Sequence, residues 1–153
     1  MAKELWIAAE CRDTGIDPAV YELLSKAIEL NDTIAEKKTI AIITMNADDA
    51  SLNALKHSGA DKVIAVKMPD TVYDPVRETA ALAGIVRKYA PEIILFAATA
   101  KGAELAPSLA AKLKTGLASH CTDLSYDEGG NLHMYSPAFG GKLIGESSNT
   151  SAG

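Results

Sequence analysis

The sequence predicts an α/β domain: an open parallel sheet with helices on both faces, followed by an antiparallel hairpin. Four short apolar segments alternate with longer segments of helical periodicity. The short segments are apolar at nearly every position, as expected of strands that are buried on both faces. After Gly116 the alternation stops, and two β-prone segments flank a glycine-containing turn. Repeated strand-helix units of this kind form parallel sheets with right-handed crossovers.

Length and composition bound the function. The chain has 153 residues, which suits one domain, and 48% of them are hydrophobic, as in an ordinary globular protein. A formal net charge of -5 and only 5% aromatic residues argue against a nucleic acid partner. The two cysteines cannot build a disulfide framework, which favours a reducing compartment.

The first two strand-helix units have clear boundaries. Residues 5–9 and 39–45 are apolar and partly β-branched, which predicts two buried strands. Asp17, followed by a proline, predicts a helix N-cap, and residues 47–57 predict a shorter helix closed by Gly59. The first helix has apolar residues at helical spacing, namely Val20, Leu23, Leu24, Ala27 and Ile28.

The next two units repeat the pattern. Residues 62–66 and 92–97 predict the third and fourth strands. Asp74, again followed by a proline, begins a helix that Pro91 ends, and the last helix stops at Gly116. The apolar positions of these helices are Ala80, Ala83 and Val86 in the first, and Leu105, Leu109 and Leu113 in the second.

The C-terminal part predicts an antiparallel extension. Residues 121–126 and 132–135 flank a turn rich in acidic residues and glycine, which indicates a hairpin. Residues 142–145 begin one more strand. Residues 147–153 are small and polar, so we expect a disordered tail or a cloning remnant after a domain that spans residues 1–146.

Motifs for catalysis and metal binding are missing from the sequence. It has no G-x-x-x-x-G-K-[ST] segment, and no G-x-G-x-x-G follows the first strand. The three histidines have no cysteine or carboxylate at metal-ligand spacing. Cys121 lacks a neighbouring cation that would activate its thiol, so we expect a buried structural cysteine. We therefore expect neither a catalytic residue nor a metal site.

The N-terminal residues indicate neither export nor membrane insertion. The apolar run at residues 5–9 is too short for a signal peptide, and no run approaches the roughly 20 residues that span a bilayer. We expect a cytoplasmic protein of a bacterium or an archaeon, without a transit peptide.

The turn at residues 98–104 is a candidate anion site. It joins the fourth strand to its helix, and ligands of open α/β sheets bind at the carboxyl ends of strands. Thr99, Lys101 and Gly102 offer a hydroxyl, an ammonium group and backbone N–H groups, and they form our candidate nucleotide cleft. The alternative is equally open: a helix entry whose small residues let the helix pack closely on the sheet.

A series of motifs in a fixed order resembles one known family. The motifs are residues 91–99, Gly102, residues 105–107, 109–113, 115–117 and 121–124, supported by residues 59–63, 73–75 and 137–141. Together they resemble the N-terminal domain of the electron transfer flavoprotein alpha subunit, from Leu5 to about Ile144. Ala103 and Glu104 stand where the family commonly has a charged pair, which weakens the case for an anion contact in this turn.

The resemblance implies a fold of the adenine nucleotide alpha-hydrolase type and a chiefly structural role. In the family this domain packs against the beta subunit, while FAD is held mainly by a C-terminal domain that we expect to be absent here. We therefore expect no FAD ligand in this chain. The complete heterodimer would carry electrons from dehydrogenases, typically of acyl-CoA substrates, to a membrane quinone-linked oxidoreductase, and some relatives bifurcate electrons through a second flavin.

Two other interpretations stay open. One is a freestanding adenine-nucleotide-binding protein resembling the universal stress proteins, although their G-x-x-G phosphate loop is missing after the fourth strand. The other is a hydrolase or ligase that uses Cys121.

An association surface is also expected. The segment from Leu132 to Ile144 should keep apolar area that the beta subunit covers, and the isolated domain would hide it by self-association. Apolar residues within this segment include Met134, Tyr135, Phe139 and Leu143.

Overall fold

A parallel sheet forms the centre of the molecule. The computed structural model describes residues 3–69, 72–118, 121, 123–138 and 143–148, with the backbone alone for residues 136–138 and 143–148. The strands of the sheet are β1 (Glu4–Ala9), β4 (Thr39–Met45), β5 (Lys62–Val66) and β6 (Ile93–Phe96). They lie in the order β5-β4-β1-β6, and every neighbouring pair is parallel, as predicted.

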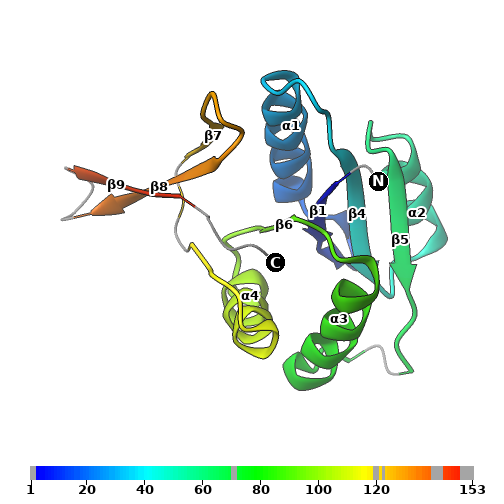
Figure 1. Cartoon of the computed structure of the whole chain (residues 1–153). Coiled ribbons are helices and arrows are strands. Elements are labelled where there is room, and N and C mark those ends of the chain that lie inside the picture. The colour runs from blue at the N-terminus through cyan, green and yellow to red at the C-terminus, as the bar shows by residue number, and fades with distance from the viewer. Residues whose placement is uncertain (1–2, 70–71, 119–120, 122, 139–142, 149–153) are drawn as a thin grey trace.

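Helices cover both faces of this sheet (Figure 1). One face carries α1 (Pro18–Asp32) and α2 (Asp49–Lys56), and the other carries α3 (Pro75–Tyr89) and α4 (Ala100–Leu113). The predicted α/β class with helices on both faces is therefore confirmed.

The double-sided burial explains why the strands are apolar at every position. Leu5 and Ile7 of β1 belong to the core beneath α1 and α2, whereas Trp6 between them belongs to the core beneath α3 and α4. All three are at most 1% exposed. Two helical positions were assigned to the wrong side: Ile28 is 39% exposed, and Ala80 is exposed. Each lies at the border of its helix's buried stripe, where spacing alone does not decide exposure.

Three helices begin at an aspartate that caps them, and two of these caps, Asp17 and Asp74, were predicted. The side chains of Asp17, Asp48 and Asp74 accept hydrogen bonds from backbone N–H groups of the first turns. Prolines at the first positions of α1 and α3 have no N–H group to leave unsatisfied there.

The end of α4 differs from the prediction. Lys114 adopts the left-handed conformation with φ 55°, so that α4 ends at Leu113, before the expected stop at Gly116. Ala90 ends α3 in the same way with φ 49°, directly before Pro91. Both residues adopt the left-handed conformation that glycine usually adopts after the last turn of a helix. A prediction that locates helix ends by their glycines therefore misses these two ends.

A second, antiparallel sheet follows the helices. Its strands are β7 (Asp123–Tyr126), β8 (Leu132–Ala138) and β9 (Leu143–Ser148), in the order β7-β8-β9, which confirms the predicted hairpin and added strand. An ion pair of 2.6 Å between Lys26 of α1 and Asp123 of β7 holds this sheet at α1. β9 includes Ser147 and Ser148, two residues of the predicted tail, while residues 149–153 lie outside the described part.

The inner face of the hairpin corrects the expected association surface. Leu132 is only 6% exposed and belongs to the core beneath α1, and Met134 packs against the same core. Leu132 is therefore not available to a partner, and Met134 is only partly accessible. Tyr135 is partly exposed and pairs with the hydroxyl of Ser125. Phe139 and the side chain of Leu143 lie outside what the structure describes.

A small hairpin after β1 was not predicted. β2 (Cys11–Arg12) pairs with β3 (Gly15–Ile16), and Gly15 has φ 115°, a conformation that favours glycine. No helix among the described residues is long and apolar enough to cross a membrane.

Candidate functional site

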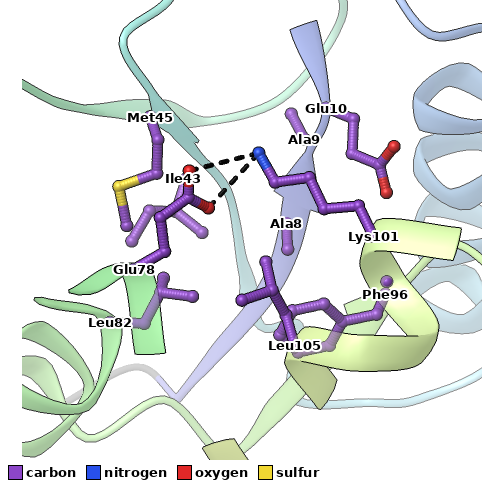
Figure 2. Close-up of a pocket in the computed structure, with 11 residues that line it drawn as sticks. Ala8, Ala9, Glu10, Ile43, Met45, Glu78, Leu82, Phe96, Lys101 and Leu105 are labelled. Atoms are coloured by element: carbon purple, nitrogen blue, oxygen red, sulfur yellow. Dashed lines mark hydrogen bonds and ion pairs between the residues drawn. The ribbon is translucent and has the colours of Figure 1, made fainter. Parts of the chain in front are cut away.

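The carboxyl ends of β1 and β6 form a crevice where open α/β sheets bind ligands. After β1 the chain adds β4 and β5 on one side of this strand, and it later adds β6 on the other side. The connection after β1 and the connection after β6 therefore lead away in opposite directions, which leaves a crevice between them. A hollow of about 360 Å³, open mouth included, lies here, and its enclosed part holds little more than one water molecule. Its lining includes Ala8, Glu10, Ile43, Glu78, Phe96 and Lys101 (Figure 2).

Thr99 and Gly102 are built into the start of α4. The Thr99 hydroxyl accepts a 3.0 Å hydrogen bond from the Gly102 N–H and donates one to the Glu10 carboxylate. A Cβ atom on Gly102 would lie 1.9 Å from the backbone oxygen of Ala97. This distance is far too short for two non-bonded atoms, so no other residue fits at this position. The glycine therefore lets α4 begin close to the end of β6, and the threonine caps the helix.

Lys101 reaches across the crevice to α3 (Figure 2). Its ammonium nitrogen lies 3.3 and 3.2 Å from the two carboxylate oxygens of Glu78, which is 8% exposed. The more distant oxygen has hydrogen-bond geometry and the nearer one does not, so we describe the contact as an ion pair with one hydrogen bond. The only ammonium group of the candidate cleft is therefore neutralised from within the domain.

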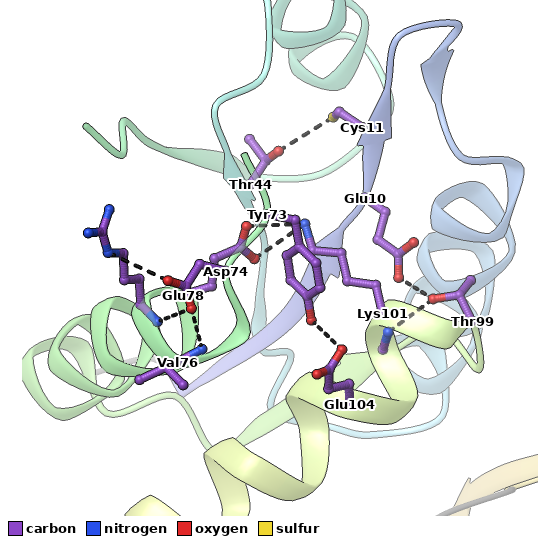
Figure 3. Close-up of polar contacts among 12 residues, drawn as sticks. Glu10, Cys11, Thr44, Tyr73, Asp74, Val76, Glu78, Thr99, Lys101 and Glu104 are labelled. Carbon is purple, nitrogen blue, oxygen red and sulfur yellow. Dashed lines mark hydrogen bonds and ion pairs between the residues drawn. The ribbon is translucent and has the colours of Figure 1, made fainter. Parts of the chain in front are cut away.

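An aromatic ring completes this network (Figure 3). The ammonium group of Lys101 lies 4.8 Å from the ring centroid of Tyr73, within range for a cation–π interaction. The Tyr73 hydroxyl donates a 3.0 Å hydrogen bond to Glu104. Burial, this hydrogen bond and the nearby carboxylates raise the pKa of Tyr73 to about 12. The ring is consequently neutral at physiological pH and links the starts of α3 and α4.

The balance of charge around the crevice is negative. Sequence reasoning brought Thr99, Lys101 and Gly102 together correctly as neighbours on one turn and noted Glu104 beside them, but it missed Glu10 and Glu78, which line the crevice. Against one ammonium group they leave an excess of negative charge, which opposes a phosphate. A signal was available, because one acidic residue directly follows β1 and another stands in the first turn of α3.

The cysteines occupy different environments. The thiol of Cys11 lies 3.4 Å from the hydroxyl of Thr44, near the carboxyl ends of β1 and β4 (Figure 3). Cys121 is exposed and its sulfur lies 3.5 Å from the Ala118 oxygen, so the expectation of a buried core cysteine is wrong. Its apolar neighbours in sequence suggested a core strand, but the residue lies outside any strand. His120 lies outside the described residues.

In the described part of the chain no group of three or more His, Cys, Asp or Glu side chains is arranged to hold a metal ion.

Comparison with known proteins gives a consistent result. A family model described as the electron transfer flavoprotein domain matches residues 5–152. The electron transfer flavoprotein subunit alpha of Thermoanaerobacterium thermosaccharolyticum is 36% identical over 143 residues, which cover 93% of this chain and 43% of that relative. The same subunit of Clostridium acetobutylicum is 35% identical over 144 residues, covering 93% and 43%. Protein FixB of Azorhizobium caulinodans is 36% identical over 148 residues, covering 93% and 39%.

The chain thus spans about two fifths of the length of these curated relatives.

Proposed function

Since the chain belongs to the electron transfer flavoprotein domain family, we propose that it is the N-terminal structural domain of an alpha subunit, with the binding of a beta subunit as its main task. The observation that carries this proposal is the similarity to alpha subunits along 93% of the chain. Two of these relatives are named electron transfer flavoprotein subunits, and the role that we propose for this chain is accordingly in electron transport rather than in catalysis.

For the complete protein we propose the route that the family resemblance implies. Electrons from dehydrogenases, typically of acyl-CoA substrates, reach FAD and pass to a membrane quinone-linked oxidoreductase. FAD is held mainly by a further domain of the alpha subunit, and this chain contributes support rather than flavin contacts. The crevice is consistent with that division, because its enclosed space is far smaller than a nucleotide and two carboxylates, those of Glu10 and Glu78, line it.

The outer face of the β7–β8 hairpin is our candidate contact with the beta subunit. Side chains alternate along strands, so the residues between the core-facing Leu124, Tyr126, Leu132 and Met134 point the other way. Ser125 and Tyr135 lie on that outer face and are joined by a 3.2 Å contact. A tyrosine with a polar neighbour is typical of partner contacts.

An absorbance scan tests the assignment of cofactor binding. The purified chain should be colourless, because no flavin contact is proposed for it. A stoichiometric flavin band near about 450 nm would contradict the division of roles between the two domains.

Adenine nucleotide binding is the competing function, and calorimetry with AMP and ATP decides it. We expect no tight binding at Thr99, Lys101 and Gly102, because Glu78 already pairs with the lysine. A micromolar dissociation constant, worth about 8 kcal/mol, would favour the nucleotide-binding interpretation. Loss of that affinity in Lys101→Ala would place the nucleotide in this crevice.

A further inference from the structure

The C-terminal ends of α3 and α4 form one basic surface. The two helices lie side by side, and the Arg87 guanidinium donates a 3.2 Å hydrogen bond to the backbone oxygen of Lys112. Figure 1 shows α3 and α4 together beneath the same face of the sheet. We define the basic surface by its five exposed residues: Arg87, Lys88, Tyr89, Lys112 and Lys114.

The four cations of the basic surface lack acidic partners. Among the described residues, no carboxylate forms an ion pair with any of them. Elsewhere, Lys26, Lys38, Lys62 and Lys101 each pair with a carboxylate. A chain with a net charge of -5 therefore concentrates unpaired positive charge at one place.

An exposed aromatic ring in the basic surface lies beside two ammonium groups. Tyr89 is 46% exposed, and the ammonium groups of Lys62 and Lys88 each lie 5.4 Å from its ring centroid. The buried ring of Trp6 lies 5.9 Å from it on the inner side. A tyrosine held in this way offers apolar contact area at a low cost in conformational entropy.

The helix dipole accounts for only part of the arrangement. Cations in the last helical turn interact favourably with the partial negative charge there, which explains Arg87, Lys88 and Lys112. The helix dipole does not explain Lys114. This residue has φ 55°, and glycine would adopt that backbone conformation with less strain. A cation thus stands at a position where the backbone conformation favours glycine.

We propose that the basic surface docks an acidic face of a partner protein. The inference rests on the proposed role in electron transport, because electron-transfer complexes are often small, transient and steered by complementary charge. The surface lies at α3 and α4, whereas the candidate contact with the beta subunit lies on the hairpin held at α1. Both partners could therefore be bound together. Tyrosine and arginine, both present in the basic surface, are enriched at protein–protein interfaces, which favours a protein.

Binding of a fluorescent octaglutamate peptide tests the proposal. The wild-type chain should bind it at low salt, and raising NaCl from about 20 to about 200 mM should weaken binding roughly tenfold, because exposed charges are screened. Lys88→Glu/Lys112→Glu should weaken binding at least about tenfold. The control Lys37→Glu/Lys56→Glu makes the same change in net charge on exposed positions outside the basic surface, and it should stay within about twofold of wild type.

A single substitution separates docking from folding. Lys114→Gly removes a cation and relieves the left-handed backbone, so peptide binding should weaken while the midpoint of thermal unfolding rises. Tyr89→Ser keeps every charge and should weaken binding about two- to fivefold through lost contact area.

Three outcomes would overturn the proposal: no binding of the peptide at low salt, equal weakening in the paired variant and its control, or tighter binding of an octathymidylate or of phosphatidylserine vesicles than of the peptide. Circular dichroism of each variant checks that it is folded. The association with the beta subunit is measured separately, so that its failure would not be mistaken for failure of the basic surface.

Discussion

The backbone oxygen of Ala97 stands 1.9 Å from the place where a Cβ atom on Gly102 would be. The contact is between two backbones, so no rotation of a side chain can relieve it. α4 can therefore start against the end of β6 only if residue 102 is glycine, and this start positions Lys101 in the crevice and Thr99 as the cap of the helix.

Gly102→Ala should destabilise the domain by more than about 3 kcal/mol, since α4 must shift away from the sheet. Gly84→Ala is the matched control: Gly84 is exposed within α3, and nothing lies within 4 Å of the added Cβ atom. It should stabilise the domain by about 0.5–1 kcal/mol through helix propensity. Urea unfolding measures both changes, and similar effects of the two substitutions would contradict the role given to Gly102.

Lys101→Met should destabilise the domain by about 1–3 kcal/mol, because it leaves the buried Glu78 carboxylate without its cation. This loss of stability is smaller than the loss expected from breaking a fully buried ion pair, because the Lys101 side chain is 31% exposed. The double variant Lys101→Met/Glu78→Gln should recover part of this loss in the same unfolding assay. Additive effects of the two substitutions would show that the pair is not coupled.

The stability of the domain should fall between about pH 10 and pH 12 in a way that depends on Tyr73. The pKa of this phenol is raised from 10.0 to about 12 in the folded chain, so the unfolded chain releases the proton first as pH rises. The contribution is complete below pH 10 and lost as pH passes through 12. Tyr73→Phe should show a shallower loss across this range. Identical pH profiles for the two proteins would refute the hydrogen bond from Tyr73 to Glu104.

Under native conditions a thiol reagent should label Cys121 well before Cys11. Cys121 is exposed, whereas Cys11 is half-buried against Thr44. Mass spectrometry after timed labelling gives the order, with Cys121→Ser as the control that leaves only the slow reaction. Faster labelling of Cys11 would mean that the small hairpin at residues 11–16 opens readily.

The parts of the fold set by local sequence were predictable. Apolar residues at successive strand positions identified the parallel sheet, because Leu5, Trp6 and Ile7 alternate between two buried cores. Aspartates before prolines located the starts of α1 and α3, because capping and proline geometry act within one turn of a helix.

Features that depend on long-range packing were not predictable. Of the carboxylates at the crevice, one follows β1 and one lies in the first turn of α3, so only the folded sheet brings Glu10 and Glu78 close to Lys101. Met134 was expected on the surface because its partners beneath α1 are distant in sequence. Lys114 ended α4 in a conformation that sequence patterns assign to glycine.

Size-exclusion chromatography with light-scattering and absorbance detection tests the central claim most directly. The chain is mixed with an electron transfer flavoprotein beta subunit from the same organism, and each protein is also run alone. We predict a one-to-one complex that is heavier than the beta subunit by the 16.1 kDa of this chain, while the chain alone carries no flavin absorbance. Elution of the two proteins at their separate masses, together with stoichiometric flavin on the chain alone, would contradict the proposal that this is a partner-binding rather than a flavin-binding domain.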